Sequence, residues 1–600
     1  MGFVFENVEE RRGEGDMKPR FGLYGRFLLL AIAVMLSVLI GTGVQAAQYN
    51  YPYPKVTSKK GLYVCPGMEE DALELGVRHA TINLSVGDFM PSAAYRNNTH
   101  CIPFDYEGTT YWFAKNAIAK YDQELIRLSQ GNVLVTAILL LPHRSDDLKY
   151  LIYPPARSKS ANYYQWDMTN PDAVRAMKAI VTFFQMRYSN PSGPRIVGWI
   201  VGNEVNNSGV WNWAGNISID SYMDLYAAQV AEVYYAARSV YANARIYMCL
   251  DHYWSVGNGS YWYAGKDILT RFAARMSARG LGRGTWCIAY HPYNISEREP
   301  NIMSSSSAVT NNVKTRIITM KNLKVLTKFV KKNYSANCRI ILSEQGYSSV
   351  TSGRDTSPEQ AKNVALAYYI AQQNNMIDAL ILHRQVDHTG EGERYGLYSS
   401  WGGENAAWQK PSWTAYKYAD TTKNNRYTNY AAKQAKKISG KKVKKLLTIR
   451  NGKLKTTPSL AWTANYTNGF GAFGALAGFS ESNGVYTLTH DYSRNPNVPW
   501  GMVRDGRINC RIRSRIGFGI YINNSLSGSA MVYLRLWSGS NRYFDAQTQV
   551  SCGVQNYLIA NLKQWKARNN ITRVEILIRP AGGGWTSSSA AQIFSLGTRK

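Results

Sequence analysis

The sequence is poor in acidic residues and in the side chains that bind metals. It has 40 Asp and Glu against 70 Lys and Arg, and only 8 His and 7 Cys among 600 residues. The motifs H-E-x-x-H and C-x-x-C are absent, so nothing in the sequence indicates a zinc site. The serine hydrolase motif G-x-S-x-G and the phosphate-binding motif G-x-x-x-x-G-K-[ST] are also absent. We therefore expect no metal and no cofactor.

Long apolar runs are scarce as well, and the one that stands out lies near the start. Residues 27–40 are apolar, follow Lys18, Arg20 and Arg26, and precede small residues at 44–46. This order is typical of a secretory signal peptide, and the run is shorter than the roughly 20 residues of a membrane span. We predict a signal peptide over residues 1–47, with Met17 as an alternative start, and a secreted protein without a stable membrane span. An uncleaved signal anchor is the alternative.

Cysteine is too rare for a disulfide scaffold. Two candidate pairs remain, Cys65 with Cys101 and Cys510 with Cys552. Cys249, Cys287 and Cys338 lie in or beside apolar runs, where a buried small side chain is the simpler interpretation. The pairing of the seven cysteines stays open.

The overall amino-acid composition is typical of a large globular protein. Hydrophobic residues make up 45% and charged residues 18%, which allows two or three domains with real cores. Aromatic residues reach 12%, with 42 Tyr and 16 Trp, and flat aromatic surfaces suit sugar rings. The formal net charge is +30, and residues 431–600 carry +20 of it. This charge should attract polyanions such as an anionic cell wall; export argues against nucleic acid as the partner.

Short apolar runs alternate with helical patterns from residue 61 to residue 418. The strand-like runs cover residues 61–64, 79–86, 133–141, 196–202, 246–251, 285–290, 339–342 and 379–383. Helical patterns follow at residues 68–75, 115–130, 172–188, 220–241, 265–279, 311–332, 358–374 and 408–418. Eight such units predict the α/β class, a (β/α)8 TIM barrel over residues 48–430. A doubly wound open sheet is the alternative.

The composition changes after the predicted barrel. Residues 431–455 hold ten Lys or Arg and no acidic residue, which predicts a flexible basic linker over residues 431–456. Residues 457–600 show alternating runs separated by Gly- and Ser-rich turns. This pattern predicts an all-β module, a jelly roll or sandwich.

Two glutamates stand at the ends of predicted strands. Glu204 follows the fourth apolar run, and Glu344 follows the seventh. Strand ends carry the reacting groups of such barrels, so these carboxylates should face one site. Paired carboxylates are what the hydrolysis of a glycosidic bond needs, because one protonates the leaving oxygen while the other attacks or activates water. A surface salt bridge at each strand end is the plainer alternative.

The residues around both glutamates carry a family resemblance. G-W-I-V-G-N-E-V-N at residues 198–206 and I-I-L-S-E-Q-G-Y at residues 340–347 resemble the strand-four and strand-seven signatures of clan A glycoside hydrolases, which are retaining (β/α)8 enzymes. The resemblance implies Glu204 as acid/base, Glu344 as nucleophile and Asn203 as a ligand of the sugar 2-hydroxyl. His291 and Tyr293 resemble the position near the nucleophile after strand six. The tail resembles the carbohydrate-binding modules of secreted glycosidases.

Two positions depart from that family pattern. Many members carry Arg at the end of strand two and Trp at the end of strand eight, where this chain has Asn83 with Ser85 and His383 with Arg384. The departures indicate a distant barrel family. Further strand-end residues could line sugar subsites: His143, Trp211, Trp254, His383 and Trp401. Packing within a loop is the alternative for each.

Taken together, these features favour a secreted, monomeric, retaining glycosidase that acts on a polysaccharide or oligosaccharide. A non-catalytic protein that binds sugar or cell wall through an inherited barrel is the alternative. A lyase or esterase acting on an acidic polysaccharide would fit the basic charge, but this sequence has neither the serine motif nor the metal cluster that such an enzyme would use. The tail could bind either sugar, by stacking, or wall polyanion, by charge.

Overall fold

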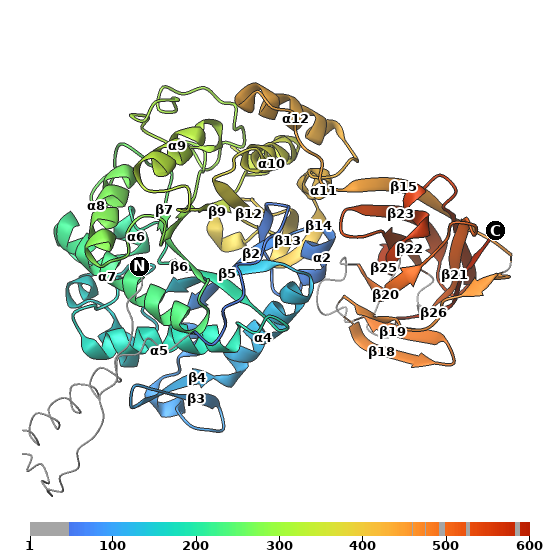
Figure 1. Ribbon diagram of the computed structural model, residues 1–600, viewed down its shortest axis with the longest axis horizontal. Coiled ribbons are helices and arrows are strands. Elements are labelled where there is room, and N and C mark those ends of the chain that lie inside the picture. Colours follow the sequence, from blue (N-terminus) through green and yellow to red (C-terminus); the bar gives the residue numbers. More distant parts are fainter. Residues whose placement is uncertain (1–46, 459, 475, 491–498, 524–527, 583–588) are drawn as a thin grey trace, which may run out of the picture. The chain divides into compact units, whose positions relative to one another are not determined.

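The computed structural model describes residues 47–600 except 459, 475, 491–498, 524–527 and 583–588 (Figure 1). The predicted signal peptide, apart from Ala47, therefore lies outside the described residues. No helix in the described ranges is both long and apolar enough to cross a bilayer.

Eight parallel strands close into a barrel, which confirms the predicted fold class. Around the barrel the order is β1, β2, β5, β6, β7, β8, β9 and β12, and β12 pairs again with β1. Their bounds are β1 Lys60–Tyr63, β2 His79–Ser85, β5 Leu134–Leu140, β6 Ile196–Val201, β7 Arg245–Leu250, β8 Cys287–Tyr290, β9 Ile340–Gln345 and β12 Ile377–Leu382. Almost every residue of these strands is buried, as both faces of a covered parallel sheet require.

Helices surround the barrel and cover its outer face (Figure 1). Their bounds are α2 Glu69–Glu74, α3 Val86–Phe89, α4 Lys115–Gln130, α5 Pro171–Arg187, α6 Ser208–Trp211, α7 Ile219–Val240, α8 Gly265–Ala278, α9 Lys324–Asn333, α10 Ser357–Gln372, α11 Pro411–Tyr418 and α12 Arg426–Ser439. In α4 the buried Ile118, Leu125 and Leu128 lie on one face, because their spacing follows the helical repeat. Inside the barrel, a separate apolar cluster includes Ile138, Ile200 and Ile341.

One predicted helix is mostly absent. The pattern at residues 311–332 predicts a continuous helix, but α9 begins only at Lys324, after a short turn at Met320–Asn322. The preceding segment uses its backbone to hold the loop after β7: the Ile318 amide donates to the His252 carbonyl, and Ile317 forms a bridge with Tyr253. These tertiary bonds replace the helical bonds that the pattern predicts.

The loops after the strands carry three hairpins: β3 Cys101–Tyr106 with β4 Thr109–Ala114, β10 Val350–Thr351 with β11 Arg354–Asp355, and β13 Tyr398–Gly402 with β14 Asn405–Gln409. The last predicted helix starts at Pro411 rather than at Trp408, which lies in β14. Proline at the first helical position explains this start. Its fixed φ suits a helix, and the N–H that it lacks would have no intrahelical partner at this position.

The predicted flexible linker over residues 431–456 is wrong in its conformation. Its first part continues α12, whose Ala431 and Ala435 are buried in the barrel's apolar core. Its last part is β15 Thr448–Thr456, a strand of the C-terminal sheets. The basic residues misled the prediction because they occupy only the exposed positions of both elements, while small or apolar residues between them are buried.

The C-terminal region is a separate, mostly antiparallel β-sandwich with its own apolar core. One sheet contains β17, β20, β25, β22 and β23, and the other β24, β21, β26, β19, β18 and β16. Their bounds are β16 Ala464–Asn465, β17 Gly471–Phe473, β18 Leu476–Ser482, β19 Val485–His490, β20 Trp500–Ile508, β21 Arg515–Asn523, β22 Ser529–Trp537, β23 Arg542–Ser551, β24 Gln555–Asn561, β25 Ile571–Gly582 and β26 Ala590–Arg599. Strand β15 pairs in parallel with β23 and, further along, antiparallel with β24, so it joins the two sheets.

Neither candidate disulfide is formed. Cys65, Cys101 and Cys510 are free, buried thiols. Cys249, Cys287 and Cys338 are buried, as expected for small core side chains.

Candidate functional site

The two predicted glutamates lie at the same end of the barrel. Glu344 is the fifth residue of β9, and Glu204 follows β6 after a turn at Gly202 and Asn203. The Glu204 backbone has a φ of +37°, in the left-handed region that non-glycine residues rarely adopt. Such local strain is costly and is often kept where a side chain must be aimed at a functional site.

His291, just after β8, joins the surroundings of the two glutamates. Its Nδ1 lies 2.8 Å from Glu204 Oε1, and its Nε2 lies 3.0 Å from the hydroxyl of Ser343, the residue before Glu344. Burial lowers the pKa of the imidazole, but Cys249, Glu344 and the hydrogen bond to Glu204 raise it well above its ordinary value. His291 therefore contacts the Glu204 carboxyl and the residue before Glu344 at the same time.

Glu344 is held in its ionised form. The Tyr293 hydroxyl donates a 2.8 Å hydrogen bond to Glu344 Oε1. Burial raises the pKa of this carboxyl, but His383, His291 and the Tyr293 hydrogen bond together bring it below its usual value. An ionised carboxylate with one fixed oxygen is suited to attack an electrophilic carbon.

A third carboxyl, Asp251 after β7, supports the Glu204 side of the site. It accepts hydrogen bonds from Asn206 Nδ2 and Trp262 Nε1 and from the Tyr253 amide. Burial and the nearby Glu204 carboxylate raise the pKa of Asp251 to about 7. Asp251 and Asn206 together fix the turn that follows Glu204.

The loop after β12 borders the Glu344 side. His383 Nε2 lies 3.4 Å from Glu391 Oε2, and the His383 ring lies between Tyr63 and Tyr395, with centroids 5.7 and 6.2 Å away. Tyr395 also lies beside Tyr293, with ring centroids 5.9 Å apart. These aromatic rings form one wall beside the nucleophile.

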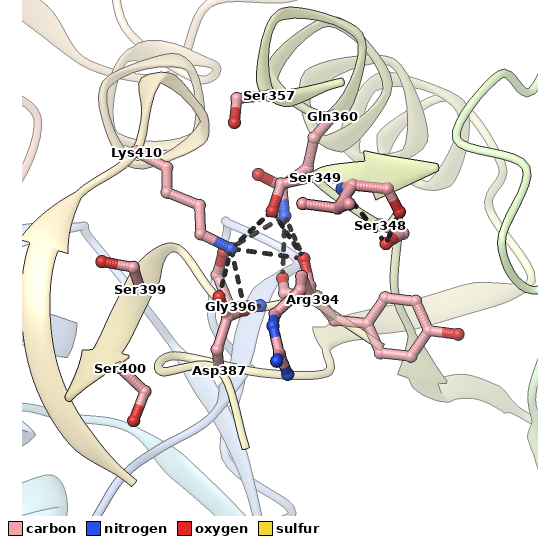
Figure 2. Close-up of polar contacts among 12 residues, drawn as sticks. Ser348, Ser349, Ser357, Gln360, Asp387, Arg394, Gly396, Ser399, Ser400 and Lys410 are labelled. Carbon is pink, nitrogen blue, oxygen red and sulfur yellow. Dashed lines mark hydrogen bonds and ion pairs between the residues drawn. The ribbon is translucent and has the colours of Figure 1, made fainter. Parts of the chain in front are cut away.

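A buried lysine fastens this loop to the loop after β9 (Figure 2). Lys410 Nζ donates 2.8 Å hydrogen bonds to Ser349 Oγ and Asp387 Oδ1, and a 3.2 Å bond to the Arg394 carbonyl. Ser349 lies five residues after Glu344, whereas Asp387 and Arg394 lie in the loop that carries Glu391. The cluster therefore fixes the two loops on either side of Glu344.

The structure brings together only part of the predicted substrate-binding set. Glu204, Glu344, His291, Tyr293 and His383 form one connected site, and Asn203 is half-buried beside Glu204. Trp211 lies against Tyr163, with ring centroids 5.9 Å apart. His143 is exposed and lines a cavity among the loops after β5.

The two remaining predicted tryptophans differ sharply in exposure. Trp254 is completely buried, donates to the Val313 carbonyl and packs edge-on against Phe329, so its role is structural. Trp401 on β13 is 73% exposed and stands 5.6 Å from Trp408 on β14, which is 61% exposed.

Sequence reasoning missed Asn206, Ser343 and Tyr395. Asn206 and Ser343 lie within the two quoted motifs, so their proximity to the glutamates was a usable signal. Tyr395 had no such signal, because only the folded loop after β12 brings it to Tyr293. Across the described ranges, no three or more His, Cys, Asp or Glu side chains converge as metal ligands.

Known proteins similar to this chain were found among solved structures. A search of curated proteins found no match. Among solved structures, the chain is similar to a glucosidase from Croceicoccus marinus, at 10% identity over 92% of this chain and 99% of that one, with a TM-score of 0.40. A Bacteroidetes-affiliated GH5 cellulase matches at 10% identity over 68% and 98%, with a TM-score of 0.39. GH5_18 from Bifidobacterium longum subsp. longum matches at 13% over 66% and 83%, with a TM-score of 0.38.

Likenesses at these identities concern the fold alone. The family comparison is more direct, because one family model, described as a family of unknown function (DUF5722), matches residues 52–444. That range includes all eight barrel strands, both glutamates and α12. The chain therefore belongs to the family DUF5722.

Proposed function

We propose that the protein is a retaining glycoside hydrolase with Glu344 as nucleophile and Glu204 as acid/base. The observation that supports this most strongly is the pair of carboxylates at the ends of β6 and β9, linked through His291 and Ser343. The lowered pKa of Glu344 suits a nucleophile that must be ionised. The motifs around both residues resemble those of clan A glycoside hydrolases.

The reaction proceeds by two displacements at the anomeric carbon. Glu344 attacks that carbon while Glu204 gives its proton to the departing glycosidic oxygen, which leaves a glycosyl ester on Glu344. Glu204, now ionised, takes a proton from water as the water attacks the same carbon, and Glu344 is released as a carboxylate. His291 orients Glu204 through its Nδ1 contact, and Tyr293 holds one oxygen of Glu344.

A panel of aryl glycosides and polysaccharides tests the activity. We expect turnover of at least one substrate, lost by several orders of magnitude in Glu344→Gln. The matched control is Glu232→Gln on α7, which makes the same change outside the site and should keep full activity. Turnover that survives Glu344→Gln would refute the assignment. Sugar binding without turnover in the unaltered protein would instead support a non-catalytic binding protein.

The stereochemical course tests the mechanism separately. A direct nucleophile requires carboxyl groups about 5–5.5 Å apart and gives net retention, whereas a water-mediated inversion needs about 6.5–9.5 Å. Proton NMR of the first-formed product, before mutarotation, should show the retained anomer. The inverted anomer would make Glu344 a general base.

We also propose that the protein acts outside the cytoplasm on a polysaccharide or oligosaccharide. The basic, apolar and small-residue order of residues 18–46 supports export. N-terminal sequencing of protein recovered from the culture medium should find a start close to residue 48, and retention of residues 1–47 would favour an anchor.

A further inference from the structure

A cavity lies among the loops that follow β5, and neither glutamate lines it. Its volume is about 330 Å³. Its lining consists of His143, Lys149, Ile152, Arg157, Lys159, Ser160 and Tyr164. Three of these side chains are cations and none is a carboxylate.

Two of the three cations are held in place by the fold. Arg157 donates from Nε and Nη2 to the Ile152 carbonyl, which leaves further N–H donors on its guanidinium. Lys159 Nζ donates to the Gly209 carbonyl and lies 4.0 Å from the centre of the Trp213 ring. Groups fixed in advance lose little conformational entropy when a ligand binds.

The nearby acidic residues leave most of this charge uncompensated. Asp167 lies 3.9 Å from Arg157 but also accepts hydrogen bonds from the Thr169 amide and hydroxyl. Asp146 lies 3.4 Å from His143 and is almost fully exposed to solvent. The lining therefore presents an excess of positive charge and of hydrogen-bond donors, the combination that binds carboxylate and sulfate groups.

The cavity lies next to the proposed active site along the chain. Tyr164 lines the cavity, and its neighbour Tyr163 packs against the inner barrel cluster and against Trp211. Strand β5, whose following loop lines the cavity, pairs with β6, the strand that ends just before Glu204. The cavity lining and the glutamates therefore follow neighbouring strands at the same end of the barrel.

We propose that this cavity is a subsite for an anionic sugar unit, one that carries a carboxylate or a sulfate ester. The proposal rests on the proposed glycosidase function and names its substrate class: a polysaccharide with acidic residues, in which the acidic unit lies away from the bond that is cleaved. We assign Lys149 and Arg157 to the ligand, because Arg157 keeps N–H donors beyond those it gives to Ile152, whereas the single ammonium of Lys159 is engaged by Gly209 and Trp213.

The test measures binding in the Glu344→Gln background, where no turnover interferes. Titration calorimetry compares a uronate-containing oligosaccharide, a sulfated one and a neutral one of equal length. We expect Lys149→Ala/Arg157→Ala to weaken binding of an anionic ligand about tenfold or more, with neutral binding unchanged. Binding of the sulfated ligand alone would assign a sulfate ester, and binding of the uronate alone a carboxylate.

The matched control is Lys332→Ala/Lys437→Ala, which removes two exposed cations from α9 and α12. Equal weakening in both double variants would attribute the binding to the general positive field, and no weakening in Lys149→Ala/Arg157→Ala would remove the subsite; either result overturns the proposal. If the double variant does not fold, Lys149→Ala alone, which shortens an exposed side chain and removes one cation of the lining, provides the test. Selective anion binding in a protein without turnover would retain the subsite and refute only the glycosidase.

Discussion

Glu204 and Glu344 have the same side chain but different surroundings. Glu344 is fixed by Tyr293 and faces two histidines, whereas Glu204 sits on a left-handed backbone position and meets His291. The strand-end pattern and the two motifs predicted both glutamates. The sequence could not predict that His291 links them, because the link depends on β6, β8 and β9. These strands are far apart in the chain, but in the barrel β8 pairs with β9 and only β7 separates β8 from β6.

Replacement of Glu204 distinguishes its role from that of Glu344. Glu204→Ala removes the proton donor, so poor leaving groups should suffer far more than activated aryl glycosides, which depart without protonation. Added azide should restore turnover and give a glycosyl azide with the substrate's own anomeric configuration. Rates and product NMR measure both effects. Equal losses on both substrate types, with no azide product, would count against this role.

Asp71 on α2 is a buried carboxyl whose charge is unfavourable. It accepts hydrogen bonds from Tyr398, Gln385 and Trp413, yet burial and the nearby Glu74 raise its pKa from 3.8 to about 6. Between these values the unfolded chain loses the proton first, so rising pH favours the unfolded state. The contribution of Asp71 to stability is full below pH 4 and is lost as the pH rises to about 6.

We expect this loss to amount to about 3 kcal/mol. The free energy of unfolding is measured with urea at pH 4 and pH 7 for the unaltered protein and for Asp71→Asn. The variant has no proton to release at this position, so the loss of stability between pH 4 and pH 7 should be smaller in the variant by about that amount. The same change in both proteins would show that Asp71 does not titrate in this range.

At the scale of elements, the apolar runs predicted all eight barrel strands to within a few residues. These strands are buried on both faces, so nearly every position must be apolar, and such continuous runs are easy to recognise in a sequence. Two predicted elements were wrong. In one, the segment forms hydrogen bonds with a distant loop, and in the other, charged residues alternate with small ones. Residues 311–319 bond to the loop after β7. Residues 431–439 are the second part of α12, where the fully buried side chains are Ala431 and Ala435.

Lys410 should be more important for stability than an exposed lysine. Lys410→Met leaves the buried Asp387 carboxylate without its cation, and breaking a buried pair in this way costs about 3–5 kcal/mol. Lys362→Met on α10 breaks only an exposed pair with Glu359, which is worth about 1 kcal/mol at most. Denaturant unfolding of both variants should show this difference. Equal losses would mean that the cluster in Figure 2 does not hold the loops.

At the scale of the whole molecule, the segment that connects barrel and sandwich is shorter than the composition suggests. The barrel's apolar core includes α12, and the sandwich has a separate core that begins with Leu454 of β15. The family match ends at residue 444, between these two elements. Composition alone could not reveal this boundary, because the basic residues continue across α12, the connection and β15.

Truncation tests this boundary. Residues 48–444 should fold and retain activity on small soluble glycosides, because they contain the whole barrel core. Residues 48–432 lose the buried Ala435 and half of α12, and should unfold at a lower denaturant concentration. Circular dichroism and aryl-glycoside rates compare the two. If the shorter form is as stable as the longer one, α12 does not belong to the barrel.

Strand β15 also has a consequence for the order in which the chain can fold during synthesis. It is the first long strand of the sandwich to leave the ribosome, yet its partners β23 and β24 lie at Arg542–Ser551 and Gln555–Asn561. For about ninety residues of synthesis it is therefore an unpaired strand, open to pairing with other chains. Its Arg450, Lys453 and Lys455 supply the charge that discourages such pairing in edge strands. We therefore expect the basic residues around the domain boundary to limit aggregation of the nascent chain until the sandwich closes.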